Sequence, residues 1–186
     1  MSAEIAKYSF TAEEFERLGE AGILRQDARL ELIEGEIFEM SPIGSLHAAC
    51  VDALALLLTE IARRRFIIRV QNPVLLNDIS EPQPDITLLR WRDDFYRNAL
   101  PKPENVLLVI EVADTTVVTD RKIKLPLYAR AGIAEAWLVN IPEKRVEIHS
   151  NSVRGVYKKA EVFGQGEEVR SHTLEGLAVS VSEFLG

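Results

Sequence analysis

Two apolar segments decide the fold, Pro84-Asp85-Ile86-Thr87-Leu88-Leu89 and, after a connection, Val106-Leu107-Leu108-Val109-Ile110-Glu111-Val112. Both are short runs of apolar and β-branched residues, which is the pattern of buried strands. Each places one acid, Asp85 or Glu111, on or beside its strand. An ionised carboxylate is costly to remove from water unless something compensates it, and a divalent cation is a compensation that two carboxylates can share. The pair indicates metal-dependent chemistry, with phosphodiester hydrolysis as the first function to test.

Composition indicates one domain over residues 1–186, with 47% apolar and 27% charged residues. The apolar stretch 46–61 contains two acids and is predicted to be a core helix rather than a membrane span. The N-terminus lacks the pattern of a signal peptide, so a cytoplasmic location is expected. Cys50, the single cysteine, is expected to be a buried thiol, and the three separated histidines do not suggest a zinc site.

The net charge of −7 argues against a strong nucleic-acid binder, which needs a basic surface. Arginines do gather at 63–65 and at Arg90, Arg92 and Arg97. Three arginines at the end of a helix are more often a solvated terminus than a phosphate clamp. Charge alone therefore leaves the nuclease hypothesis open.

Local patterns predict a helix opened by a capping box of Thr11 and Glu14, and a hairpin of 30–33 and 36–40 around Glu34-Gly35. Ser45 is expected to cap a helix that runs to about Arg65. The remaining predicted elements are strands at 66–70, 73–76, the Asp85 and Glu111 segments, a helix over 120–131 complicated by Pro126, a strand at 135–139, and a C-terminal meander of 145–149 and 156–159.

The connection 91–104 is unusually long and mixes aromatic residues with arginines and acids. It is either a functional segment or a surface insertion that packs its aromatics inward. The element order predicts an α/β (α+β) fold with a mixed central sheet flanked by helices.

Several separated motifs carry a resemblance to a known family. In order they are Arg29-Leu30-Glu31-Leu32-Ile33-Glu34-Gly35-Glu36, Met40-Ser41-Pro42 with His47, Gln83-Pro84-Asp85, Ile110-Glu111-Val112, the run from Asp120 to Ile133, and Trp137-Leu138-Val139. Over roughly residues 8–185 the chain resembles the bacterial Uma-two family, described as restriction-endonuclease-like proteins of the PD-(D/E)XK nuclease superfamily. The resemblance implies a restriction-endonuclease-like core.

The resemblance also implies the site residues. Asp85 matches the aspartate of the "PD" element, and Glu111 matches the acid of the "(D/E)XK" element. Ala113 stands where that element has its lysine. The resemblance suggests that the lysine has moved to Lys124, in the pattern Asp120-x-x-x-Lys124-x-x-x-Tyr128, where a spacing of four places all three residues on one helix face. Lys122 is the competing lysine.

With this assignment, Asp85, Glu111 and the carbonyl of Val112 would hold Mg²⁺, with Mn²⁺ as a substitute. Lys124 would orient or deprotonate the attacking water and offset charge on the phosphate. Two further residues each have two open roles: Glu31 is a third acid acting through water or a solvent-facing glutamate, and His47 is a phosphate contact or an ordinary helix-start histidine. Tyr128 is expected to pack beneath the site.

The function predicted from sequence is a Mg²⁺-dependent endonuclease that hydrolyses DNA with a metal-activated water. DNA binding is expected to depend on the metal, and a homodimer is expected because two strands require two sites. No organic cofactor and no membrane association are expected. Two alternatives stay open: an inactive binding or scaffold module with the same fold, and a hydrolase of a small phosphate ester.

Overall fold

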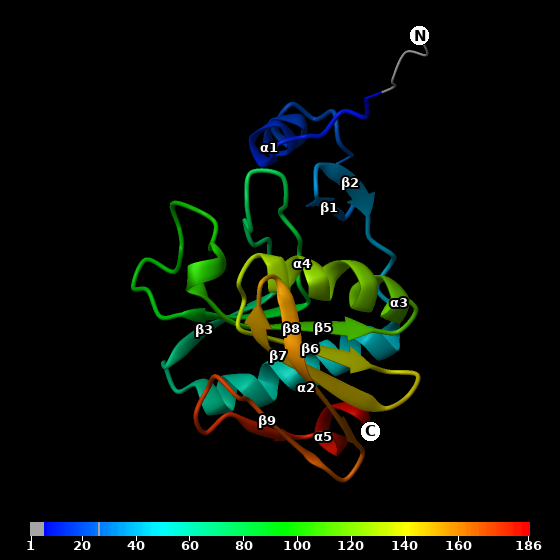
Figure 1. The fold of residues 1–186 in the computed structure, drawn as a ribbon, viewed down its shortest axis with the longest axis vertical. Coiled ribbons are helices and arrows are strands. Elements are labelled where there is room, and N and C mark those ends of the chain that lie inside the picture. The colour runs from blue at the N-terminus through cyan, green and yellow to red at the C-terminus, as the bar shows by residue number, and fades with distance from the viewer. Residues whose placement is uncertain (1–5, 26) are drawn as a thin grey trace.

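A six-stranded mixed sheet in the order β3-β4-β5-β6-β7-β8 forms the centre of the molecule (Figure 1). Only β5 and β6 pair in parallel, and each other neighbouring pair is antiparallel. This computed structural model describes residues 6–25 and 27–186. The first residues of the chain, which lack the pattern of a signal peptide, lie mostly outside the described part. The strands are β3 (Phe66–Val70), β4 (Ile86–Arg90), β5 (Val106–Ala113), β6 (Glu135–Asn140), β7 (Arg145–Val153) and β8 (Val156–Gly164).

Helices cover both faces of this sheet, which confirms the predicted fold class (Figure 1). On one face α2 (Ser45–Ala62) packs with Leu54 and Leu58 fully buried, beside Ile110 of β5. By length and composition α2 could cross a membrane, but these side chains lie in the core, as expected. On the other face the helical segment α3 (Val117–Thr119), η2 (Asp120–Lys124) and α4 (Leu125–Arg130) covers a second core.

The N-terminal part lies above the sheet in Figure 1 and consists of α1 (Ala12–Glu20) and the hairpin β1 (Leu30–Ile33) and β2 (Glu36–Glu39). The predicted capping box of Thr11 and Glu14 is present. The predicted hairpin turn is also present, with positive φ at both Glu34 and Gly35. Backbone hydrogen bonds join the hairpin to the loop before β4, including Gly35 N to Ile79 O at 2.8 Å.

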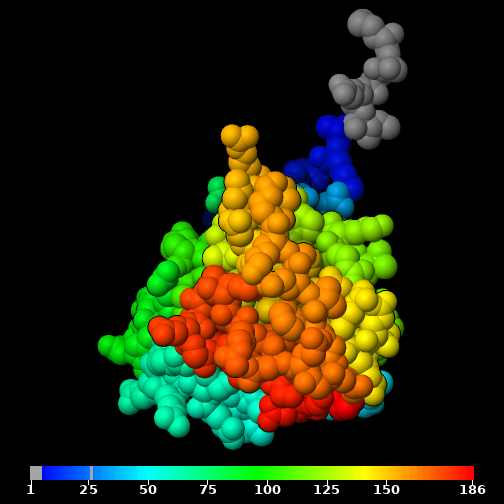
Figure 2. Space-filling model, turned by 60° about the horizontal axis from the view of Figure 1, so that its bottom comes forward, coloured from blue at the N-terminus to red at the C-terminus, as the bar shows by residue number. Residues whose placement is uncertain are grey.

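The C-terminal meander of β6, β7 and β8 is also confirmed, and the β7–β8 hairpin projects from the body (Figure 2). Three short elements after it were not predicted: β9 (Glu168–Arg170), β10 (Ala178–Ser180) and α5 (Ser182–Leu185). They contribute Val169, Val179 and Phe184 to the core around α2. The connection between β4 and β5 contains one short 3-10 helix, η1 (Pro103–Asn105).

Two predicted elements differ from the structure. The cap of α2 is Gly44 rather than Ser45, and the helix ends at Ala62 because Arg63 and Arg64 adopt positive φ. The segment 73–76 is not a strand of the sheet. Its backbone bonds within its own loop, for example Leu76 N to Ser80 O at 2.9 Å, while β3 pairs directly with β4.

The predicted helix over 120–131 contains a π-helical turn, η2, in front of Pro126. Proline has no N–H, so a regular helix would leave the carbonyl of Lys122 without its partner four residues later. The turn widens instead, and Leu125 N bonds to Asp120 O five residues back. The helix is therefore interrupted at the segment that carries Asp120 and Lys124.

Candidate active site

Asp85 and Glu111 project from the same face of the sheet. Ile86 of β4 pairs with Ile110 of β5, and both belong to the core beneath α2. Because side chains alternate along a strand, their neighbours Asp85 and Glu111 point to the opposite face. Both acids are buried, at 6% and 2% exposure.

The Asp85 carboxylate is held by three donors. One oxygen, Oδ1, lies 3.0 Å from His47 Nε2 and accepts from Gln71 Nε2 at 3.2 Å. Oδ2 accepts from the backbone N–H of Val112 at 2.9 Å, so the backbone expected to supply a metal ligand lies against Asp85. Burial opposes ionisation, but the hydrogen bonds outweigh it, led by that of His47, and hold the pKa of Asp85 below its usual value. Asp85 is thus an ionised carboxylate.

Glu111 lies between a lysine and a tyrosine from the helical segment above it. Its Oε1 accepts a short hydrogen bond from the Tyr128 hydroxyl and lies 3.4 Å from Lys124 Nζ. The Tyr128 side chain is fully buried beneath the site, as predicted. Ala113 is fully buried two residues after Glu111, on the same face of β5.

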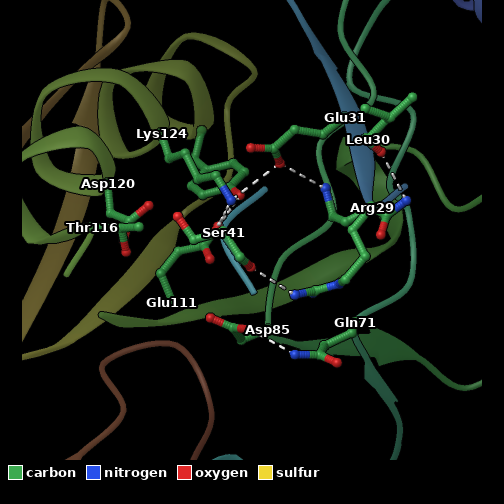
Figure 3. A network of polar contacts seen from close by, with 12 residues as sticks. Arg29, Leu30, Glu31, Ser41, Gln71, Asp85, Glu111, Thr116, Asp120 and Lys124 are labelled. Carbon is green, nitrogen blue, oxygen red and sulfur yellow. Dashed lines mark hydrogen bonds and ion pairs between the residues drawn. The ribbon is translucent and has the colours of Figure 1, made fainter. Parts of the chain in front are cut away.

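Glu31 belongs to the same group because the hairpin folds over the sheet. Its Oε2 lies 3.1 Å from Lys124 Nζ and accepts from Gln83 N at 3.2 Å. Figure 3 shows Lys124 between Glu31 and Glu111, with Asp85 below them. Glu31 is 6% exposed, so it is a buried member of the site rather than a solvent-facing glutamate.

Asp120 and Lys122 are placed differently from each other. Asp120 is buried and its Oδ2 accepts from Thr116 Oγ1 at 2.6 Å. Lys122 is exposed, whereas Lys124 is 5% exposed and points into the site. The structure therefore brings Lys124, and not Lys122, to the carboxylates.

Burial gives these groups perturbed pKa values. It raises the pKa of Glu111 well above its usual value; Lys124 opposes that shift, while Asp120 and Asp85 add to it. Burial likewise raises the pKa of Asp120; the positive charge of Lys124 opposes this increase, and the negative charge of Asp85 adds to it. Burial alone would lower the pKa of Lys124, but Glu111, with Glu31 and Asp120, raises it instead. Three acids, Glu31, Glu111 and Asp120, thus act on the buried ammonium group of Lys124.

A cavity of about 540 Å³ opens onto this group, and Asp85, Asp120 and Lys124 are among its lining residues. Two further lining residues have polar atoms that are buried without a hydrogen-bond partner among the described residues, His47 Nδ1 and Arg29 Nη2. The Asp85 hydrogen bond, partly opposed by burial, raises the pKa of His47. Arg29 also donates weakly to the Ser41 carbonyl at 3.5 Å (Figure 3). The cavity is thus lined both by acids and by basic side chains that keep an unpaired nitrogen.

Arg29 had no role in the sequence prediction. It stands in the resembling motif beside Glu31, but nothing in its spacing indicates that its guanidinium reaches the cavity. Cys50, by contrast, is the buried thiol that was expected, and burial raises its pKa to about 12.

The oxygen atoms of these side chains are of the type that a hard divalent cation binds. Mg²⁺ is commonly bound by one or two carboxylates together with water and substrate phosphate. Asp85 and Glu111 provide two carboxylates. Burial first, and the charges of Asp120 and Asp85 after it, raise the pKa of Glu111, and a bound cation would favour its ionised form. Within the described ranges, no group of three or more His, Cys, Asp or Glu side chains is arranged to hold a metal ion. Any cation would depend on water or substrate for its remaining ligands.

Comparison with known proteins now identifies the family. The model of the Uma2 family, described as "Putative restriction endonuclease", matches residues 12–182. The chain belongs to the Uma2 family. A solved structure with the same fold is that of "a putative nuclease belonging to DUF820" from Anabaena variabilis ATCC 29413, with a TM-score of 0.71, 18% sequence identity, and coverage of 95% of this chain and 97% of that chain. No curated protein matches significantly.

The Uma2 match extends over every segment that lines the cavity, from the N-terminal hairpin to the helical segment of Lys124. It confirms the resemblance stated from sequence motifs. The Uma2 family and its fold give the class of protein, while the arrangement of individual side chains comes from this chain alone.

Proposed function

We propose that this protein is a Mg²⁺-dependent nuclease, with Asp85 and Glu111 as metal ligands and Lys124 as the catalytic lysine. The observation that supports the proposal best is that Asp85 and Lys124 line one cavity from separate segments, with the buried Glu111 carboxylate 3.4 Å from Lys124 Nζ. The family description and the nuclease described for the structural relative point to the same class of reaction. Mg²⁺, when bound, would activate a water and polarise the scissile phosphate.

Lys124 is proposed to act as a fixed positive charge. The acids around it raise its pKa, so it stays protonated and is poorly suited to deprotonate water. Of the two roles predicted from sequence, this favours orienting the water and offsetting charge on the phosphate oxygens. Tyr128 holds Glu111 in place by its hydrogen bond.

Arg29 and His47 are proposed to bind the substrate phosphate. Their unpartnered Nη2 and Nδ1 atoms are the donors of the cavity that no described residue uses. A phosphate oxygen accepts hydrogen bonds from guanidinium and imidazole groups, and such charge-assisted bonds are strong. The substrate would then lie between these donors and the carboxylates.

The test compares DNA binding and cleavage in EDTA, Ca²⁺ and Mg²⁺ at fixed ionic strength, for the wild type and Asp85→Asn. A carboxylate site repels phosphate until a cation reverses its charge, so Ca²⁺ should tighten binding of the wild type and leave Asp85→Asn unchanged. Mg²⁺ should in addition support cleavage. Equal affinity in all three conditions would contradict the proposal.

That outcome would favour the second candidate, a scaffold module that keeps the fold without catalysis. Ala113 in place of a lysine and the net charge of −7 are the observations that support it. The nuclease proposal also includes a homodimer, because cutting both strands of a duplex requires two sites. Sedimentation of the free protein measures this directly.

A further inference from the structure

The connection between β4 and β5 forms a basic and aromatic surface outside the cavity. Together with Arg64 and Arg69, the segment 90–104 carries six basic and three acidic side chains in a chain of net charge −7. In Figure 1 this segment lies beside β3, at the opposite side of the sheet from α3, and in Figure 2 it adjoins the end of α2. We define the arginine–aromatic surface as Arg64, Arg69, Arg90, Trp91, Phe95 and Arg97.

Contacts hold these residues together. The Arg64 guanidinium lies over the Trp91 ring at 5.2 Å, and the Trp91 and Phe95 rings meet edge-to-face at 5.4 Å. Arg69 Nη2 donates to the Phe95 carbonyl at 3.0 Å. The Tyr96 hydroxyl donates to the Arg90 carbonyl at 2.7 Å and anchors the segment to the end of β4. The surface is a packed structure and not a loose loop of charges.

The arginines of this surface differ from most others in the chain. Arg17, Arg25, Arg121, Arg130, Arg145 and Arg170 each form an ion pair with a carboxylate. Arg64, Arg69, Arg90 and Arg97 form none with the described residues. Two of the three nearby acids are already engaged, since Asp93 accepts from Trp91 and Asp94 pairs with Arg92. Arg69 and Arg90 each use one nitrogen on a backbone carbonyl, so all four guanidinium groups keep donors that no carboxylate of the described residues uses.

The backbone also exposes an aromatic ring here. Phe95 and Tyr96 are consecutive residues with φ of +52° and +56°, a conformation that bulky side chains rarely adopt. The result is that Tyr96 is buried at 3% exposure while Phe95 is 53% exposed among the arginines. An unfavourable backbone conformation that exposes a large apolar ring is more consistent with binding than with stability.

From these observations we infer that the arginine–aromatic surface binds single-stranded nucleic acid. The guanidinium groups contact phosphates, and Phe95 stacks on an unpaired base, which is how strand-binding grooves combine charge and aromatic side chains. Arg69 connects the surface to the neighbourhood of Asp85, because it lies two residues before Gln71, which donates to the Asp85 carboxylate at 3.2 Å.

This inference goes beyond the proposed nuclease function and does not depend on it, because the surface contains no metal ligand and no cavity residue. Its test is fluorescence anisotropy with a labelled mixed-sequence oligodeoxynucleotide in EDTA. The variants are Phe95→Asn and the pair Arg64→Gln with Arg97→Gln. The matched control is Arg154→Gln with Lys158→Gln, two cations of the β7–β8 hairpin that also lack a carboxylate partner among the described residues.

Asparagine tolerates positive φ, so Phe95→Asn should keep or raise the melting temperature. It should weaken single-strand binding at least about fivefold, as expected for one lost stacking contact. Arg64→Gln with Arg97→Gln should remove two phosphate contacts, so the steepness of log affinity against log salt concentration should decrease by about 1.4. The control pair should leave this steepness unchanged.

Three results would overturn the inference. The first is wild-type binding by Phe95→Asn, and the second is an equal loss in the control pair, which would indicate a general charge effect. The third is stronger binding of the matching duplex than of the single strand. A failure of metal-dependent cleavage alone would contradict the proposed nuclease and leave this inference standing.

Discussion

At the scale of single residues, the lysine of the site comes from the helical segment and not from β5. Ala113 stands two residues after Glu111, and Lys124 contacts Glu111 and Glu31 from the helical segment. A lysine at 113 would point to the same face of the sheet, because residues two apart on a strand share a face. Lys124 therefore places a positive charge beside the carboxylates, as a lysine at position 113 would, but from the helical segment.

Replacing this lysine should separate catalysis from metal binding. We expect Lys124→Gln to lower the cleavage rate by about a hundredfold or more, as for loss of a group that stabilises charge in the transition state. Metal affinity should not fall, because removing a cation from among acids favours a second cation. Lys122→Gln is the matched control, since Lys122 is exposed, and it should cleave normally. Single-turnover rates and Mn²⁺ titration measure the two effects.

Lys124→Arg completes this test because it keeps the charge but changes the position of the donors. It should fold as the wild type does and remain far less active. Equal losses in the Lys122 and Lys124 variants would mean that the lysine assignment is wrong.

At the scale of elements, the N-terminal hairpin completes the site by docking on the loop before β4. Leu32 and Glu81 form a backbone bridge between them, and Gln83 Nε2 donates to the Leu30 carbonyl at 3.2 Å. These contacts bring Glu31 over the sheet. One residue of this contact, Glu81, is a buried acid whose Oε2 has no hydrogen-bond partner among the described residues. Burial, with a contribution from Glu16, raises the pKa of Glu81 to about 7.

Glu81 should make the fold less stable as pH rises. Between about pH 4.5 and pH 7 the unfolded chain releases this proton while the folded chain keeps it, so the free energy of unfolding falls with pH. Glu81→Gln should remove this loss and be more stable than the wild type at pH 8 by about 2 kcal/mol, with little difference at pH 4.5. Denaturant unfolding at the two pH values measures the difference. A variant that is less stable at both would show that the carboxyl makes a contact the account lacks.

The elements also show what the sequence could and could not predict. Alternation and capping predicted α1, the hairpin and the meander because these depend on neighbouring residues. The predicted strand at 73–76 was wrong because this segment forms backbone hydrogen bonds within its own loop. The end of α2 at Ala62 was not predicted because it depends on positive φ at Arg63 and Arg64. Asp85 and Glu111 were predicted from their apolar surroundings, and Asp120 and Lys124 from the family resemblance. The role of Glu31 was left open, and Arg29 was not predicted.

At the scale of the whole molecule, charge is divided between two regions. Buried acids lie at and beneath the cavity around Lys124 and His47, and the arginine–aromatic surface is formed by the connection between β4 and β5. The net charge of −7 therefore does not describe the surfaces that matter for a polyanionic substrate. Metal-free binding is expected at the second region, and the additional affinity that a divalent cation provides is expected at the first.

The most direct test of the central claim, that Asp85 and Glu111 form a site for a divalent cation, is calorimetric titration of Mn²⁺ into the wild type, Asp85→Ala and the exposed control Asp52→Ala. This measurement needs no knowledge of the natural substrate. We predict weak but measurable binding at one site in the wild type and in Asp52→Ala, and none in Asp85→Ala. Equal binding by Asp85→Ala, or no binding by the wild type, would contradict the account.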